Sequence, residues 1–235
     1  MDFLNLANML TWYVAFLFSV TAHEAAHAFI AMKGGDLTAY QGGQVSLNPL
    51  PHIKRSPFGT VVVPILSFIF GGWMIGWASA PYDPNWAARY PRRAAIMAAA
   101  GPAANLLIAI LAFTSIKLGL VFGAFSAPDS ITFTSVVVAE SGGGFGLARL
   151  LSVLLSLNLI LCLFNLFPVP PLDGSSVITL FMSDELTMKY RQFMSQPAFS
   201  FLGIIIAWRL FPQVWRVVFV LVVNLLHPGG DWGYS

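Results

Sequence analysis

Runs of about twenty mainly apolar residues recur along the chain, and they limit its fold more than any other feature. The clear runs cover residues 3–32, 94–117, 145–167 and 199–226. A helix needs about 20 such residues to cross the hydrocarbon core of a bilayer. Hydrophobic residues make up 57% of the 235 and charged residues only 9%, against about 25% charged in a soluble domain. We therefore expect an all-α polytopic membrane protein, with residues 1–235 forming one integral membrane domain.

The first apolar run contains a motif of ionisable residues, because residues 23–27 read HEAAH. On a helix, His23 and His27 project from one face about one turn apart, the spacing at which two imidazoles bind one metal ion. Glu24 follows His23 directly, and in H-E-x-x-H sites this glutamate is the general base rather than a ligand. Ionisable groups inside a membrane span are unfavourable unless they are paired or ligated. The motif therefore favours a metal site over the alternative of simple hydrogen bonds between helices.

Two histidines leave a catalytic zinc site incomplete, since such a site usually has three protein ligands and one open position. The candidates for the third ligand are His52 in a Gly/Pro-rich segment, His227 near the C-terminus, and Asp173 in NLFPVPPLDG. The prolines before Asp173 cannot continue a regular helix, and irregular backbone at membrane depth is tolerated only around a buried site or a water-filled cavity. Asp173 is therefore the predicted third ligand, with a surface turn as the alternative. His227 is expected at the surface.

Taken together, HEAAH and NLFPVPPLDG resemble the two motifs of the site-2 protease family, the intramembrane zinc metalloproteases of peptidase family M50. The segments NPLPHIKRSPFGT and GWASAPYDPNWAARYPRRAAIMAAAGPAANLLIA are similar to its short branch without a PDZ domain, so the resemblance covers about residues 15–180. It implies one Zn2+ ion held by His23, His27 and Asp173, with Glu24 as the catalytic general base. It also implies substrates that are transmembrane proteins in the lipid bilayer.

The resemblance also implies a three-helix catalytic core within about residues 3–180 and roles for three further residues. Asn165 begins the second motif and resembles the position thought to hold substrate or orient the catalytic carboxylate. Asn105 in GPAAN corresponds to a polar position on the middle core helix, structural or facing the substrate. His52 recurs in this branch, and we expect a structural or substrate-side role for it rather than metal ligation. Residues 78–81 read ASAP where the branch often has a lysine and a valine, which weakens any role for that loop.

The two motifs also constrain the topology. Both lie at the C-terminal ends of apolar runs, the first and the third, so those two helices must run parallel, and the second run crosses back between them. The interrupted apolar stretch at residues 58–77 is then expected to form a re-entrant or bent hairpin, broken at Pro64 or at residues 71–72. The alternating sequence within residues 34–57 suits one or two short strands or turns better than a helix.

Basic residues indicate the orientation, because they gather in the segments at one end of the predicted bundle and are absent from residues 118–144. The positive-inside rule makes the basic end cytoplasmic, so we expect the active site toward the cytosolic face of a bacterial or archaeal cell membrane. The net charge is only +2, so the sequence does not indicate the concentrated basic surface of a nucleic-acid-binding protein. The sequence leaves the oligomeric state open. The basic residues at this end are Lys33, Lys54, Arg55, Arg89, Arg92, Arg93, Lys189 and Arg191.

These observations predict an intramembrane zinc metalloendopeptidase that hydrolyses peptide bonds in or near transmembrane segments, as in regulated intramembrane proteolysis. The alternative is a polytopic membrane transporter or metal-binding protein that uses the same residues without hydrolysis. The single cysteine, Cys162, allows no disulfide within the chain and no thiolate cluster for a metal.

Overall fold

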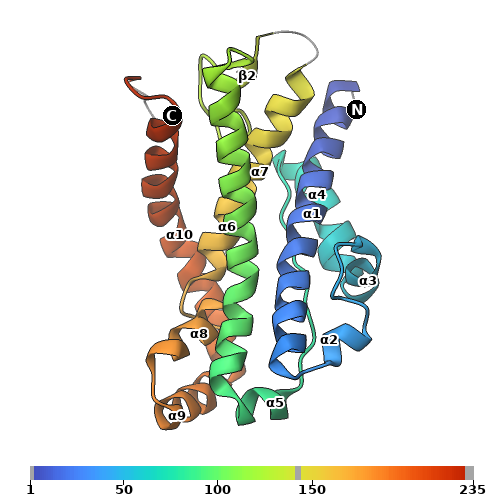
Figure 1. Cartoon of the computed structure of the whole chain (residues 1–235), viewed down its shortest axis with the longest axis vertical. Coiled ribbons are helices and arrows are strands. Elements are labelled where there is room, and N and C mark those ends of the chain that lie inside the picture. The colour runs from blue at the N-terminus through green and yellow to red at the C-terminus, as the bar shows by residue number, and fades with distance from the viewer. Residues whose placement is uncertain (1–2, 141–143, 231–235) are drawn as a thin grey trace.

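The computed structural model describes residues 3–140 and 144–230, and its long helices stand side by side as a bundle (Figure 1). Four of the described helices are long and apolar enough to span a membrane. The predicted all-α polytopic class is thus confirmed, and the four expected runs lie within these helices except for a residue or two at the end of the third. The helices are α1 (Phe3–Gly34), α6 (Pro91–Val121), α7 (Phe145–Asn165) and α10 (Pro197–Leu226).

Helices α1, α6 and α7 pack against one another and form the core of the bundle. Helices α1 and α7 run parallel, with α6 antiparallel to both (Figure 1), as the positions of the two motifs required. The buried face of α6 consists largely of alanines, including Ala94, Ala98 and Ala109, and small side chains let membrane helices approach closely. Trp12 and Phe16 of α1 fill the space beside α7 and are each 1% exposed.

Residues 34–57 contain two short helices, α2 (Thr38–Gln41) and α3 (Pro49–Arg55), joined by turns. The preference for strands or turns over helix was therefore wrong for the part that folds into α2 and α3. At α3 the reason lies in the sequence NPLP. The side chain of Asn48 accepts a hydrogen bond from the Leu50 N–H at 3.0 Å as the N-cap, and proline is favoured in a first helical turn. These local signals outweigh the alternation of polar and apolar residues.

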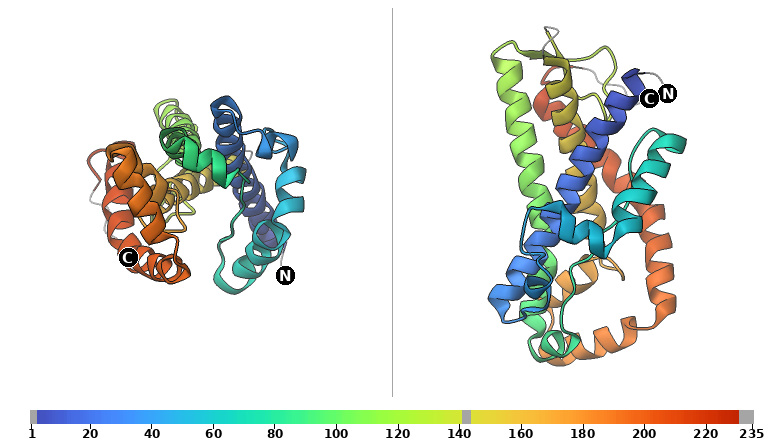
Figure 2. Two further views of the ribbon diagram at one scale, coloured as in Figure 1. Left: turned by 90° about the horizontal axis from the view of Figure 1, so that it is seen from below. Right: turned by 90° about the vertical axis from the view of Figure 1, so that its right-hand side faces the viewer.

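The stretch after α3 forms the expected hairpin. A π-helical turn, η1 (Phe58–Val62), leads into α4 (Val63–Gly71), and the axis bends by 114° between α3 and this pair. Residues 58–71 rise only about 21 Å as a helix, less than the roughly 30 Å of a hydrocarbon core. Gly72 then adopts a left-handed conformation with φ +74°. The chain returns without regular structure to α5 (Pro84–Arg89), at the end of the bundle where α1 finishes (Figures 1 and 2).

The returning arm of this hairpin is held against its starting turn by the backbone. The Trp77 N–H donates to the Gly59 carbonyl oxygen at 3.0 Å, and the Ile75 N–H donates to Ser67 Oγ at 3.0 Å. A Cβ atom at Gly59 would lie 2.2 Å from the Trp77 oxygen, and one at Gly76 would lie 2.2 Å from the Gly59 oxygen. Both glycines are therefore required by the close approach of two backbone segments.

The C-terminal end of α1 is fastened to α5 by polar contacts. The indole N–H of Trp86 donates to the Gly34 carbonyl oxygen at 3.0 Å. The Asp36 carboxylate accepts hydrogen bonds from the Thr38 N–H and hydroxyl and, at 2.8 Å, from the Asp83 N–H. Burial raises the pKa of Asp36, but these hydrogen bonds outweigh it and hold the pKa below its usual value. The carboxylate thus stays ionised and fixes the position of the helix that carries HEAAH.

Short helices complete the end of the bundle that lies beyond α7. They are α8 (Gly174–Val177), the 3-10 turn η3 (Ile178–Phe181) and the amphipathic α9 (Asp184–Met194), which lies roughly across the bundle (Figure 2). At the opposite end, β1 (Phe125–Ser126) pairs antiparallel with β2 (Val138–Ala139).

The same opposite end contains His227, which was predicted to be a surface residue. It is instead only 8% exposed, and its Nε2 donates to the Val136 carbonyl oxygen at 3.0 Å. The prediction was wrong because the segment between α6 and α7 folds over the end of α10. Lys117 reinforces this contact, since its Nζ donates to the carbonyl oxygens of Leu225 and Leu226 at 2.9 and 3.0 Å.

Candidate metal centre

Three of the predicted side chains converge at one point between α1 and the end of α7. The Nε2 atoms of His23 and His27 lie 3.0 Å apart, and Asp173 Oδ2 lies 3.1 Å from the first and 3.3 Å from the second. Both histidines are buried at 7% exposure. Within residues 3–140 and 144–230, these three side chains form the one group of His, Cys, Asp or Glu residues placed to hold a metal ion.

Local sequence explains how Asp173 reaches the histidines. The prolines after α7 end the helix, and Asp173 becomes the residue that precedes α8. A Cβ atom on Gly174 would lie 2.3 Å from the carbonyl oxygens of both Leu166 and Phe167, so only glycine permits this approach. The chain can therefore fold back tightly beneath α7 and present the carboxylate to α1.

Helix α6 forms the wall of the site opposite α1. Gly101 faces both imidazoles, because a Cβ atom there would lie 2.3 Å from His27 Nε2 and 2.5 Å from His23 Nε2. Gly101 was not among the predicted site residues. The sequence did contain an indication of its role, because Gly101 and Pro102 lie inside an apolar helix. Gly101 also precedes Asn105 by four residues, which places the two on the same helical face.

The second nitrogen of each imidazole is engaged with α6, which fixes the tautomers. His27 Nδ1 lies 2.7 Å from the Met97 carbonyl oxygen, which can only accept. His23 Nδ1 lies 2.6 Å from Asn105 Oδ1, and the amide nitrogen of Asn105 donates instead to Asn158 Oδ1 at 2.8 Å. Each Nδ1 therefore carries a proton, and Nε2 is the nitrogen of each imidazole that remains to bind a metal.

This donor set fits a zinc ion. Asp173 Oδ2 is buried without a hydrogen-bond partner, although both Nε2 atoms lie within 3.3 Å of it. A cation bound among these three buried atoms would satisfy all of them. Zinc–ligand bonds of about 2.0–2.2 Å in a tetrahedron give ligand separations of about 3.3–3.6 Å, a few tenths of an ångström more than the 3.0, 3.1 and 3.3 Å observed. A fourth tetrahedral position remains for water.

The other predicted site residues lie as follows. Glu24 is buried at 7% exposure, and its carboxylate makes no hydrogen bond or salt bridge with another described residue. Asn105 is completely buried and contacts His23 directly. His52 is not among the metal donors, and its Nε2 donates to the Ser46 carbonyl oxygen within its own loop at 3.0 Å. The amide of Asn165 donates to its own helix; its role stays a prediction.

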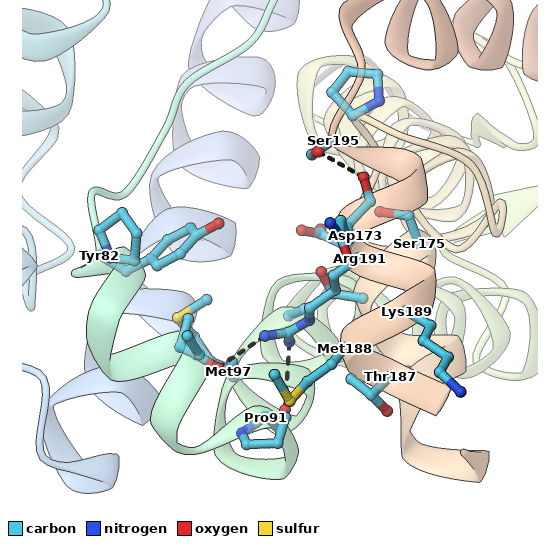
Figure 3. Close-up of a pocket in the computed structure, with 18 of the residues that line it drawn as sticks. Tyr82, Pro91, Met97, Asp173, Ser175, Thr187, Met188, Lys189, Arg191 and Ser195 are labelled. Atoms are coloured by element: carbon cyan, nitrogen blue, oxygen red, sulfur yellow. Dashed lines mark hydrogen bonds between the residues drawn. The ribbon is translucent and has the colours of Figure 1, made fainter. Parts of the chain in front are cut away.

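A pocket of about 980 Å³ opens beside Asp173 at this end of the bundle (Figure 3). Arg191 of α9 lines the pocket and donates to the carbonyl oxygens of Ala87 at 2.8 Å and Pro91 at 3.5 Å. The pocket thus connects the metal centre with the polar side chains of α9. Other lining residues are Tyr82, Met97, Ser175, Thr187, Met188, Lys189 and Ser195.

Comparison with known proteins agrees with this geometry. The sequence profile of peptidase family M50 matches residues 11–209. The chain belongs to peptidase family M50. This M50 chain is 35% identical over 166 residues to the Bacillus subtilis protein named "Putative zinc metalloprotease YwhC", an alignment that covers 70% of the chain and 66% of the relative. No solved structure matches the chain.

Two mycobacterial M50 relatives carry the name "Putative zinc metalloprotease Rip2". The protein of Mycolicibacterium smegmatis is 30% identical over 169 residues, covering 72% of the chain and 56% of the relative. That of Mycobacterium tuberculosis is 28% identical over 163 residues, covering 69% and 53%. The chain thus spans less than two thirds of the length of these relatives. Nothing in the comparisons supports the transporter alternative.

Proposed function

We propose that this M50 protein is a zinc metalloendopeptidase that cleaves transmembrane segments of other membrane proteins. The proposal rests on the geometry of the candidate metal centre. Three lone-pair donors, His23 Nε2, His27 Nε2 and Asp173 Oδ2, meet within 3.3 Å of one another, and the carboxylate of Glu24 adjoins them on the same helix. A transporter needs the ligands but has no need of a buried carboxylate beside them.

The proposed chemistry assigns one role to each of these residues. His23, His27 and Asp173 would hold the ion. When bound, zinc supplies Lewis acidity, which polarises a carbonyl and lowers the pKa of water. Glu24 accepts a proton from the attacking water and passes it to the departing amine as the peptide bond breaks. Proton transfer by a positioned group of this kind contributes about 10²–10⁴-fold to the rate.

Substrate access follows from the position of the centre at one end of the core helices. The pocket beside Asp173 supplies the water that hydrocarbon excludes. A substrate helix must unwind locally before cleavage, because its carbonyl groups are engaged in helical hydrogen bonds. Cleavage is therefore expected near one membrane face, in a segment of the substrate that leaves the helical conformation readily.

The basic residues support the cytosol as the side of cleavage. Six of the 12 basic residues lie at the end of the bundle that carries the pocket, whereas Lys117 and Arg149 lie toward the opposite end. Lys54 and Arg55 belong to α3, which lies about halfway along the bundle (Figure 1). The six are Lys33, Arg89, Arg92, Arg93, Lys189 and Arg191. The positive-inside rule assigns the more basic end to the cytoplasm. We propose the cell membrane of a bacterium or archaeon as the location, in keeping with the bacterial relatives.

The proposal is tested with Glu24→Gln, which retains the size of the side chain but cannot accept the proton. Wild-type and variant protein are expressed separately in a host that lacks its own M50 proteins, and new peptide N-termini in the membrane fraction are identified by mass spectrometry. New termini inside transmembrane segments are expected with the wild type and not with Glu24→Gln. Metal analysis of the purified proteins should give equal zinc contents.

Glu140→Gln is the matched control, because it makes the same chemical change on an exposed residue at the opposite end of the bundle. It should yield the wild-type set of termini. Identical termini with Glu24→Gln and wild type would contradict the role of Glu24, and no new termini with the wild type would contradict the peptidase assignment.

A further inference from the structure

A network of buried polar side chains lies behind the metal centre and joins the three core helices. Ser19 of α1, Asn105 of α6 and Asn158 of α7 are each 0% exposed. Asn105 Nδ2 donates to Asn158 Oδ1 at 2.8 Å and to the Ser19 carbonyl oxygen at 3.3 Å. Asn158 Nδ2 donates to Ser19 Oγ at 2.8 Å and to the Leu154 carbonyl oxygen at 2.9 Å. Ser19 Oγ donates in turn to the Ala15 carbonyl oxygen at 2.6 Å.

The direction of each hydrogen bond follows from groups that can only accept. The backbone carbonyl of Leu154 has no proton to give, so the NH₂ group of Asn158 must donate to it. The amide oxygen of Asn158 then faces Asn105, which must present its own NH₂ group there. The amide oxygen of Asn105 is consequently the atom that faces His23.

His23 lies at the end of this chain of hydrogen bonds. Because Asn105 Oδ1 can only accept, His23 Nδ1 at 2.6 Å must carry a proton, and Nε2, 3.1 Å from Asp173 Oδ2, is the nitrogen that remains to bind a metal. His27 reaches the same tautomer in another way, since its Nδ1 bonds the backbone carbonyl of Met97. No side-chain substitution removes that carbonyl. His23 is thus the ligand whose tautomer depends on other side chains.

We propose that Asn158 is a positioning residue for the zinc ligand His23 and that it acts through Asn105, although it does not touch the ligand. The inference rests on the metal site of the proposed function. Without Asn158, the amide of Asn105 loses the nearer of its two acceptors and keeps only the Ser19 carbonyl oxygen at 3.3 Å. A flipped amide would present NH₂ to His23 Nδ1 and favour the tautomer with the proton on Nε2, which cannot bind a metal through Nε2.

The test is the zinc affinity of the whole protein in detergent, measured by competition with a chelator of known affinity. Wild type, Asn158→Leu, Asn105→Leu and the double variant are compared. Residues that orient a ligand are worth about 10–100-fold in metal affinity, and each single variant should lose that much. The double variant should bind zinc no more weakly than Asn105→Leu, because residues that act through one another are not additive.

Nitrogen NMR of the histidine rings in the zinc-free protein provides a second readout. His23 should be protonated on Nδ1 in the wild type and should become a mixture of tautomers in Asn158→Leu. A purely structural role for Asn158 would lower the thermal midpoint without moving these signals.

Ser152→Ala is the matched control for a loss of buried hydrogen bonds on the same helix. Ser152 is also 0% exposed, and its Oγ accepts from the Val136 N–H at 3.1 Å and donates to the Ala148 carbonyl oxygen at 2.8 Å. These contacts lie outside the network that reaches His23. The variant should unfold at a lower temperature and keep the wild-type zinc affinity.

The outcomes separate this inference from the proposed function. A wild-type protein that binds no zinc rejects the metal site itself. Wild-type zinc affinity in Asn158→Leu, or a loss that adds in full to that of Asn105→Leu, rejects only the positioning role.

If Asn158→Leu does not fold, Ser19→Ala replaces it, because it removes one acceptor of the Asn158 NH₂ group. It should weaken zinc binding several-fold, and unchanged affinity again rejects the positioning role.

Discussion

At the scale of single residues, Gly101 decides how much space the metal centre has. The Cβ atom that any other residue would add lies 2.3 and 2.5 Å from the two imidazole Nε2 atoms, close to the zinc–nitrogen distance of about 2.0–2.1 Å. That Cβ atom would therefore occupy the space beside the two nitrogens that are proposed to bind the ion. Glycine inside a helix is less favourable than alanine by about 0.5–1 kcal/mol, so its presence here opposes the intrinsic preference of the helix.

We predict that Gly101→Ala abolishes zinc binding, because the added methyl group takes the space beside both Nε2 atoms. The measurement is the zinc content of the purified protein by elemental analysis. Gly146→Ala is the control, because a Cβ atom there meets nothing within 4 Å. Stoichiometric zinc in Gly101→Ala would show that the ion is bound elsewhere.

At the scale of elements, the re-entrant hairpin depends on two backbone segments that touch. Gly59 in the π-helical turn and Gly76 in the returning arm lie against each other, and the Trp77 N–H donates to the Gly59 oxygen. Because the neighbouring atoms belong to the backbone, they cannot rotate away as a side chain would. The hairpin therefore has no room for a methyl group at its base.

Gly59→Ala is expected to separate the two arms and lower the free energy of unfolding by at least about 2 kcal/mol, as overpacking of a core does. In a chain of this size that corresponds to a fall of about 4–8 °C in the thermal midpoint, measured in detergent. Gly71→Ala serves as the control within the same hairpin, since its Cβ atom would meet only the Trp73 side chain at 3.3 Å. Equal midpoints for the two variants would rule out the backbone contact as the cause.

At the scale of the whole molecule, the parallel arrangement of α1 and α7 brings the two motifs to the same end of the bundle. The hairpin makes this possible, because it returns the chain to the end where α1 finished before α6 crosses (Figures 1 and 2). A complete span in place of the hairpin would put HEAAH and Asp173 at opposite faces. The fold therefore requires the loops before and after the hairpin to share one side of the membrane.

Labelling with a membrane-impermeant maleimide tests this arrangement in intact cells. Exposed positions are replaced singly by cysteine: Gln41→Cys before the hairpin, Asn85→Cys after it and Ser130→Cys between α6 and α7. The native Cys162 is buried at 5% exposure and should give little background. Only Ser130→Cys should react from outside, while the other two should react after lysis. Reaction of Gln41→Cys and Asn85→Cys from different sides would exclude the re-entrant hairpin.

Much of the site could be predicted because its signals are local. The spacing of His23 and His27 is a property of one helix, and the prolines before Asp173 end another. The preference for strands or turns over helix within residues 34–57 was wrong at α2 and α3. At α3 the reason is that a capping asparagine and a following proline favour a helix despite the alternation. Gly101 and Asn158 were missed because nothing in their own segments says which helix face meets the histidines.

The sequence by itself determined the membrane class, the four spans and the three candidate metal donors, since apolar length, helical spacing and proline are read from neighbouring residues. Only the tertiary structure decided which nitrogen of each imidazole faces Asp173. That choice depends on hydrogen bonds among α1, α6 and α7, between residues 53 to 139 positions apart. Such contacts arise from the packing of three helices, and they orient the imidazoles.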